Sequence, residues 1–175
     1  MYREDDETNP INHYGYTKLL GEKYCLDRDY CIARTCVIYG AKPASGKVNF
    51  VLWLINKLKN GEKVGIVTDQ YITPTLNTNL AKMMLEIAER KIKGIFHLAG
   101  ATRVSRFEFA EAVADEFELD ESLITPSKME DINWIAARPR DSSLDTSKAA
   151  SLLNEKPYTL ERSLKMLKEE VIKVK

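Results

Sequence analysis

The stretch NHYGYTKLLGEKY, residues 12–24, places a tyrosine and a lysine four residues apart, at Tyr14 and Lys18. Apolar and small residues recur at helical spacing here and predict a helix from Tyr14 to about Asp27. Side chains four apart lie on the same face of a helix, so a phenol and an ammonium group project into one small region. An ammonium group beside a phenol favours the phenolate and makes the phenol a usable proton donor or acceptor. The same spacing also arises by chance, from a packed aromatic residue and a lysine that extends to solvent.

Downstream of this helix, short apolar strands alternate with helices of about 10 to 15 residues, which predicts βαβ units and a parallel sheet. The pattern predicts strands at 30–40, 63–68, 94–100 and 122–127, and helices at 48–61, 77–91, 105–119 and 159–175. Asn77 or Thr78 is the expected N-cap of the 77–91 helix, and Ser105 with Glu108 forms a capping-box pattern. Repeats and flexible linkers are absent from the sequence, so residues 1–175 are expected to form one unit.

The composition excludes several classes of function. Lys plus Arg and Asp plus Glu each number 26, so the formal charge is zero and nothing favours nucleic acid or an acidic membrane as a partner. Cys25, Cys31 and Cys36 have neither disulfide-framework nor zinc spacing, which indicates reduced thiols and no metal site. The N-terminus has no apolar signal region, and the longest apolar run, FVLWLI, is too short to span a bilayer. We therefore expect a cytoplasmic protein.

Five segments, in order over about residues 10–155, resemble the extended short-chain dehydrogenases/reductases, and most closely their dTDP-4-dehydrorhamnose reductase branch. The segments are YGYTKLLGE (14–22), ARTCVIYG (33–40), VTDQYITPT (67–75), GIFHLAG (94–100) and ARPRDSSLDTSK (137–148). Each motif alone is weak to moderate, but their shared order makes the resemblance strong. The rhamnose reductases often have an aromatic residue where Val37 stands, so the identity of the sugar stays open.

The resemblance implies transfer of a hydride from NADH or NADPH to a nucleotide-linked keto-sugar. In that family pattern Tyr14 protonates the carbonyl oxygen and Lys18 holds the nicotinamide ribose, so both are catalytic and cofactor-binding. The following strand supplies further cofactor contacts at Arg34, Val37 and Ile38, although core packing is the alternative role for Val37 and Ile38.

The substrate-binding residues implied by the same resemblance are Asn49, Gln70, Thr73, Thr75 and Arg138. Each has a structural alternative. Asn49 stands where a helix N-cap is expected, and the loop 69–75 is a candidate turn around Pro74. The guanidinium of Arg138 suits a phosphate but equally suits a surface ion pair. His97 lies in an apolar strand and is expected to be a core histidine with satisfied hydrogen bonds.

The sequence contains no G-x-x-G-x-x-[GA] turn of the kind that receives a dinucleotide pyrophosphate. The expected fold is therefore the C-terminal part of a Rossmann-like, doubly wound α/β sheet with the small α/β substrate-binding lobe, and without the N-terminal dinucleotide-binding βαβ units. These residues alone are expected to bind NAD(P) weakly and to lack activity. Expected partners are the nucleotide sugar and either a separately encoded N-terminal half or a second copy. The alternatives are a sugar-nucleotide epimerase, a non-catalytic subunit like the regulatory subunit of methionine adenosyltransferase, or a truncated reading frame.

Overall fold

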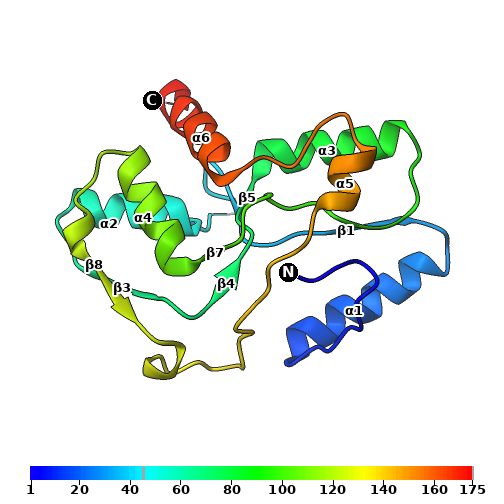
Figure 1. The fold of residues 1–175 in the computed structure, drawn as a ribbon, viewed down its shortest axis with the longest axis horizontal. Helices are drawn as coiled ribbons and strands as arrows, with labels where there is room; N and C mark the ends of the chain where they lie inside the picture. The colour runs from blue at the N-terminus through cyan, green and yellow to red at the C-terminus, as the bar shows by residue number, and fades with distance from the viewer. Residues whose placement is uncertain (45, 175) are drawn as a thin grey trace.

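The computed structural model describes residues 1–44 and 46–174, which form a mixed α/β fold. The helices are α1 (His13–Leu26), α2 (Phe50–Lys59), α3 (Asn77–Glu89), α4 (Arg106–Glu116), α5 (Ser147–Leu152) and α6 (Leu160–Val174). The strands are β1 (Cys31–Arg34), β2 (Ile38–Tyr39), β3 (Val64–Val67), β4 (Tyr71–Ile72), β5 (Thr75–Leu76), β6 (Gly94–His97), β7 (Val104–Ser105) and β8 (Ile124–Ser127). Figure 1 shows α2, α4, β3 and β8 at one end of the molecule and α1, β1, α3 and α5 at the other.

The strands pair in two-stranded ladders, and most of these are parallel, as the alternation of strands and helices predicts. The pairs β1–β6, β2–β5 and β3–β8 are parallel, whereas β4–β7 is antiparallel. In the first pair Cys31 lies opposite Gly94, and Arg34 lies opposite His97. Parallel strands end at the same edge of a sheet, so this register brings Arg34 and His97 together at the carboxyl edge, where ligands bind in open α/β sheets.

Two hydrophobic clusters hold these elements together. The larger one lies among α2, α4 and α6, where the side chains of Leu54, Phe109 and Leu167 are fully buried. The smaller one joins α3, β6 and α5 through residues such as Met83 and Leu98. Each fully buried side chain of this size contributes roughly 1.5–3 kcal/mol of transfer free energy. These clusters fix the strand ends from which the site residues extend.

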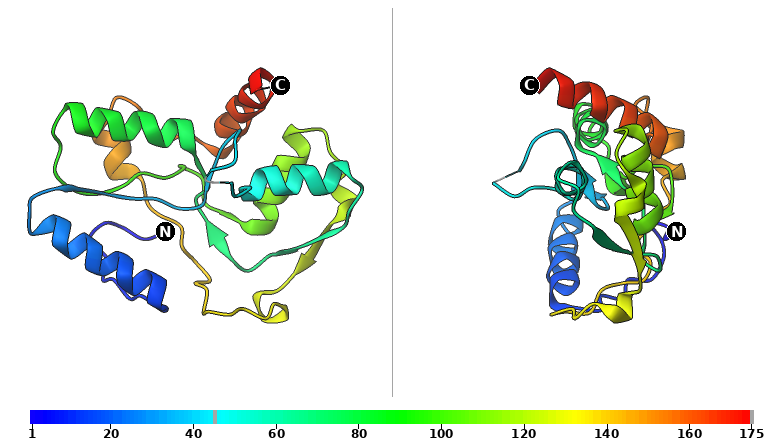
Figure 2. Two further views of the ribbon diagram at one scale, coloured as in Figure 1. Left: turned by 180° about the vertical axis from the view of Figure 1, so that it is seen from behind. Right: turned by 90° about the vertical axis from the view of Figure 1, so that its left-hand side faces the viewer.

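Helix α1 takes no part in either cluster, because none of its residues is buried. It packs beside β1, and both views in Figure 2 place it on the opposite side of the molecule from α6. With so little apolar burial, the position of α1 depends on polar ties at its ends. Those ties are part of the candidate site.

The strand predicted at 30–40 is wrong in one respect, because it is two strands separated by a sharp break. Val37 has a φ of 40°, which is strained for a β-branched residue. The break is held from the neighbouring segment: Thr75 donates its backbone N–H to the Val37 carbonyl (3.1 Å) and its hydroxyl to the Cys36 carbonyl (2.6 Å). These bonds come from residues far along the chain, so local sequence gives no sign of the break.

Of the two helix caps predicted at α3 and α4, the one at α4 is confirmed and the one at α3 is wrong. The capping box at α4 is confirmed: Ser105 Oγ accepts the Glu108 N–H (3.1 Å), and Glu108 Oε2 accepts the Ser105 N–H (2.6 Å). The N-cap predicted at Asn77 or Thr78 is wrong, because β5 runs directly into α3 and Leu76 occupies the cap without a side-chain bond. The hydroxyl of Thr78 instead donates to Glu170 on α6 (2.8 Å).

Candidate active site

Helix α1 begins at a cap that also ties it to a distant loop. Asn12 Oδ1 accepts the N–H of Gly15 at 2.8 Å, which satisfies one of the free donors of the first turn. The amide nitrogen of the same side chain donates to the Ala137 carbonyl at 2.8 Å. Ala137 directly precedes Arg138, so one asparagine couples the helix that presents Tyr14 to the loop that presents Arg138.

The tyrosine and lysine of the opening stretch do converge. Lys18 Nζ lies 5.4 Å from the centroid of the Tyr14 ring, within the range of a cation–π contact. The Tyr14 side chain is 72% exposed, and its hydroxyl bonds no described residue. Tyr16, the other phenol nearby, lies near the ring of His13 (6.4 Å between centroids). Tyr16 is 50% exposed, so Tyr14 is the more open of these two phenols.

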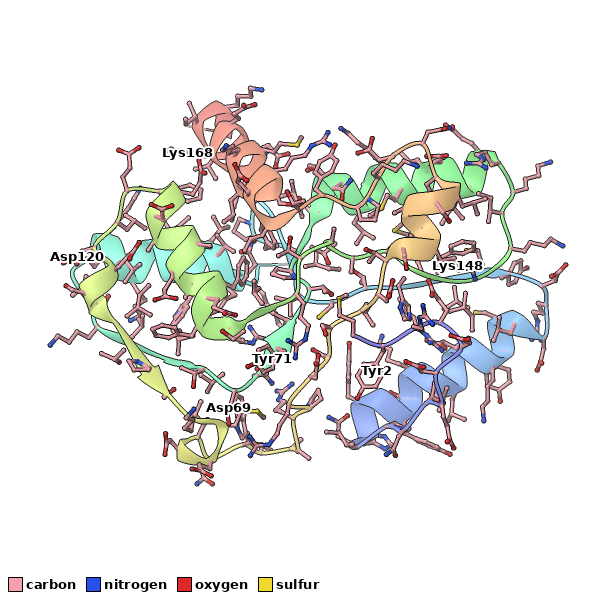
Figure 3. The ribbon with its side chains drawn as sticks, viewed as in Figure 1. Tyr2, Asp69, Tyr71, Asp120, Lys148 and Lys168 are labelled. Atoms are coloured by element: carbon pink, nitrogen blue, oxygen red, sulfur yellow. The ribbon has the colours of Figure 1, made fainter. Side chains whose placement is uncertain are left out.

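A cleft of about 1140 Å³ lies beside Tyr14, between α1, the N-terminal segment, the end of β1 and the loop 132–144. It is of the size that holds a cofactor or a large substrate. The predicted site residues that line it are Tyr14, Lys18, Arg34, Val37, Gln70 and Arg138. Figure 3 shows Tyr2, another lining residue, next to α1. The structure thus brings six of the ten predicted site residues to one cleft.

Arg34 lines this cleft, but most of its guanidinium is already used. Its Nη2 and Nε donate to the two carboxylate oxygens of Glu22 at 2.7 and 2.9 Å. Both side chains are only 19% exposed, so this bidentate pair is better shielded than a surface ion pair. Its main role in the structure is to tie α1 to β1, and with the Asn12 bond it holds α1 from both sides.

The remaining cofactor candidates differ in position. Val37 lines the cleft, and its positive φ turns the chain there between β1 and β2. Ile38 does not line the cleft; it lies exposed in β2 opposite Thr75. Strained backbone that is held in place by its surroundings is common at binding sites. Of these two residues, Val37 is therefore the better candidate for a ligand contact.

Three predicted substrate residues lie outside the cleft and bond the protein's own backbone. Asn49 is the N-cap of α2, where its Oδ1 accepts two backbone N–H groups and its amide donates to the Gly40 carbonyl (2.9 Å). Thr73 and Thr75 are fully buried. The Thr73 hydroxyl accepts the Leu144 N–H (3.3 Å), and Thr75 holds the break at Cys36 and Val37. Each of these three side chains therefore holds the protein's own backbone, and none of them lines the cleft.

Two residues that line the cleft, Arg106 and Trp134, are not among the site residues that the sequence predicts. Arg106 directly follows the cap residue Ser105, and its place in a capping-box pattern gives no hint of a ligand role. Trp134 anchors its ring by donating Nε1–H to the Met129 carbonyl at 3.0 Å. The centroid of the Trp134 ring lies 5.6 Å from the Arg138 guanidinium carbon. Proximity to Arg138 in the sequence was the one signal that pointed to Trp134.

His97 is buried, as predicted, but its hydrogen bonds are not all satisfied. Its Nδ1 lies 3.1 Å from the Asp145 carbonyl, and its backbone N–H donates to Glu4 (2.9 Å). The other ring nitrogen, Nε2, has no partner among the described residues and the side chain is 1% exposed. Burial lowers the pKa of the imidazole against the opposing effect of the Glu4 charge, so the neutral ring is favoured.

This pKa shift predicts a loss of stability in mild acid. In the unfolded state His97 has the usual histidine pKa of about 6.5. Just below that pH the unfolded state therefore binds a proton on His97, whereas the folded state, with its lowered pKa, does not. The contribution is therefore complete above about pH 6.5 and is lost as the pH falls below it. We expect the free energy of unfolding, measured by urea denaturation from pH 7.5 to 5, to fall less steeply for His97→Gln than for the wild type. His13→Gln, at the exposed second histidine, is the matched control and should keep the wild-type slope; equal slopes for all three proteins would contradict the assignment.

Two further site types find no support in the described residues. Among residues 1–44 and 46–174, no group of three or more His, Cys, Asp or Glu side chains is arranged to hold a metal ion. In the same residues, no helix is both long enough and apolar enough to cross a membrane.

The parallel β1–β6 pair, with helix α1 beside β1, defines a class, the proteins with a partial Rossmann-like α/β fold. The family can be stated more closely. Residues 1–172 match the model of the RmlD substrate binding domain, and the chain belongs to that family.

Similar proteins agree with this assignment. The chain is 37% identical over 170 residues to the "Probable low-salt glycan biosynthesis reductase Agl14" of Haloferax volcanii, a match that spans 95% of this chain and 57% of the relative. It is 33% identical over 159 residues to the methionine adenosyltransferase 2 subunit beta of Bos taurus, spanning 86% of this chain and 47% of the relative. The dTDP-4-dehydrorhamnose reductase of Bacillus anthracis, solved in complex with NADP, superposes with a TM-score of 0.87 at 27% identity, over 97% of this chain and 59% of that one. The chain thus spans a little over half the length of the reductases that it matches.

Proposed function

We propose that this chain supplies the catalytic and substrate-binding part of an NAD(P)-dependent reductase that acts on a nucleotide-linked keto-sugar. The observation that carries the proposal is the pair formed by Tyr14 and Lys18, which share one helix face and open into the cleft. Similarity to the glycan biosynthesis reductase and to the dTDP-4-dehydrorhamnose reductase supports the substrate class.

The residues present fit one end of the cofactor and not the other. Tyr14 has an exposed hydroxyl and Lys18 a free ammonium group, which suit a ribose and a reacting carbonyl. No glycine-rich turn for the pyrophosphate occurs in the sequence, so that end of the cofactor needs residues from another polypeptide segment. When bound, the nicotinamide supplies the hydride.

The chain's own contribution is the proton. The Tyr14 hydroxyl donates its proton to the sugar carbonyl oxygen as the carbonyl carbon gains the hydride, and the ketone becomes a secondary alcohol. The Lys18 ammonium group stabilises the phenolate that remains. Because the Tyr14 side chain is largely exposed, water can return the proton directly.

Reconstitution tests the proposal. These 175 residues, taken alone, should show no turnover of a dTDP-4-keto-6-deoxy sugar and no micromolar affinity for NADPH by calorimetry. Mixing with a dinucleotide-binding half, such as that of a dTDP-4-dehydrorhamnose reductase, should start net oxidation of NADPH that depends on the keto-sugar. Micromolar NADPH binding by this chain alone would refute the cofactor argument. Mixtures that stay inert at high protein concentration would count against the reductase.

A second candidate is a non-catalytic subunit, favoured by the 33% identity to the methionine adenosyltransferase subunit. Such a subunit does not need an exposed phenol and ammonium pair, which is why we place it second. Stoichiometric co-elution of this chain with a methionine adenosyltransferase catalytic subunit on size exclusion would reverse that order.

A further inference from the structure

Both polar atoms of the Asn12 side chain are bonded to the protein. Its Oδ1 accepts the Gly15 N–H and caps α1, and its Nδ2 donates to the Ala137 carbonyl, each at 2.8 Å. Serine and aspartate cap a helix about as well as asparagine does, but aspartate has no donor and serine has a single oxygen. The second bond, to Ala137, is therefore what asparagine adds at this position.

The loop that Asn12 reaches forms another wall of the cleft. Ala137 belongs to the loop 132–144, most of which lines the cleft. Residues 132–138 are all exposed, so little apolar burial holds this wall in place. In Figures 1 and 2 the loop runs from the β3–β8 end of the molecule toward the first turn of α1. Its position therefore depends on hydrogen bonds to its backbone.

The bonds that hold this loop come from two sides. On the side away from α1, the Gln70 amide donates to the Pro139 carbonyl at 3.1 Å. On the α1 side, the Asn12 amide acts alone, because no other described hydrogen bond or ion pair joins residues 12–26 to residues 128–142. Without the Asn12 amide, α1 and the loop would be free to move apart while Gln70 still holds the loop.

The first turn of α1 links Asn12 to the phenol that opens into the cleft. Tyr14 is the second residue of α1, so it lies in the turn that Asn12 caps. The backbone is closely packed there: a Cβ at Gly15 would lie 3.2 Å from the Cβ of Pro10 and 3.5 Å from the Oδ1 of Asn12. Because this turn has little slack, a displacement of Asn12 is passed on to Tyr14.

We propose that Asn12 is a positioning residue, which fixes the Tyr14 hydroxyl at a set distance from the loop 132–144 and does not itself contact the substrate. In naming Tyr14 as the proton donor, the inference rests on the proposed function. A displacement of about 1 Å between reacting groups can cost about 100-fold in rate, so the loss of this one bond should be measurable.

Two substitutions at Asn12 remove the bond to the loop and keep the helix cap. Asn12→Asp and Asn12→Ser each leave an oxygen for the Gly15 N–H, and neither supplies the amide donor for Ala137. Serine adds no charge, so agreement between the two variants excludes an effect of the new carboxylate. Asn49→Asp is the matched control, because Asn49 caps α2 in the same way and its amide donates to Gly40, outside the cleft.

Fluorine NMR of this chain labelled with 5-fluorotryptophan measures the position of the loop. The sequence has two tryptophans, and Trp134 lies in the loop whereas Trp53 lies in α2. In both Asn12 variants we expect the Trp134 line to shift and narrow as the loop gains freedom, while the Trp53 line keeps its wild-type position. A general loss of structure would move both lines. Asn49→Asp should leave the Trp134 line unchanged.

Turnover in the reconstituted assembly measures the consequence for the proposed reaction. Asn12→Asp and Asn12→Ser should lower the turnover number at saturating keto-sugar by about 10- to 100-fold. The solvent deuterium isotope effect should rise, because a misplaced donor slows the proton transfer. A smaller fraction of folded protein would lower the rate and leave the isotope effect unchanged.

Either of two results would overturn the inference. The first is a Trp134 line that keeps its wild-type position in both Asn12 variants, or that moves only together with the Trp53 line. The second is an active assembly in which both variants keep the wild-type turnover and isotope effect. The fluorine lines are recorded on this chain alone. An inert wild-type assembly would therefore sink the proposed function, and the lines would still decide whether Asn12 holds the loop.

Discussion

Tyr14→Phe is expected to lower the turnover number for keto-sugar reduction by about 10²–10⁴-fold in the reconstituted assembly, the usual effect of removing a general acid. The variant keeps the ring and its contact with Lys18 and loses only the hydroxyl, the proposed proton donor. A loss of this size corresponds to roughly 3–5 kcal/mol of transition-state stabilisation. Initial rates of NADPH oxidation at saturating keto-sugar measure it.

The same variant should fold as well as the wild type. The Tyr14 side chain is 72% exposed and its hydroxyl bonds no described residue, so the free energy of unfolding should change by less than about 0.5 kcal/mol. Tyr16→Phe, two residues along the same helix, is the matched control and should retain wild-type turnover. Equal turnover for wild type and Tyr14→Phe would remove Tyr14 from the mechanism, and equal losses in both variants would point to the helix as a whole.

The part of the site predictable from sequence is the part encoded locally. Tyr14 and Lys18 meet because helical spacing alone brings positions four apart together. Asn49 and Ser105 cap their helices because a side-chain oxygen just before a helix satisfies free N–H groups of its first turn. The parallel direction of the β1–β6 pair follows from the alternation of strands and helices.

Features set by distant residues could not be predicted. The break at Val37 is held by Thr75, 38 residues later, and the apolar pattern of 30–40 is the same with or without it. Gln70 was predicted as a substrate contact, but the structure shows its amide committed to Arg106 and Pro139. Arg106 itself looked like an ordinary first-turn residue of a helix. Its place on the cleft is set by the folded arrangement and has no local signal in the sequence.

Polar ties set the geometry of the cleft more than hydrophobic packing does. Helix α1 buries no residue and is held by the Arg34–Glu22 pair and the Asn12–Ala137 bond. The opposite side of the cleft is held by Gln70, which belongs to the segment between β3 and β4 and bonds Arg106 and Pro139. The geometry between the two sides therefore depends on how firmly the segment 70–76 is fixed against the core.

Gly100→Ala tests that fixation and is expected to destabilise the protein by at least about 3 kcal/mol, a large part of the 5–15 kcal/mol typical of a domain. A Cβ at Gly100 would lie 2.1 Å from the carbonyl oxygen of Pro74 and 3.7 Å from that of Tyr158. Both neighbours are backbone atoms, so no side chain can rotate away. Relief requires moving the 70–76 segment as a whole, which would also break the bond from the Gly100 N–H to Thr75 (3.3 Å).

Gly65→Ala is the matched control, since the same methyl group would meet nothing closer than 3.9 Å. Alanine costs less conformational entropy than glycine in a strand, so this variant should be neutral or up to about 1 kcal/mol more stable. Urea midpoints followed by circular dichroism compare the two. A wild-type midpoint for Gly100→Ala would mean that the segment yields freely. In that case Gln70 could not hold Arg106 and the Pro139 backbone at a fixed spacing across the cleft.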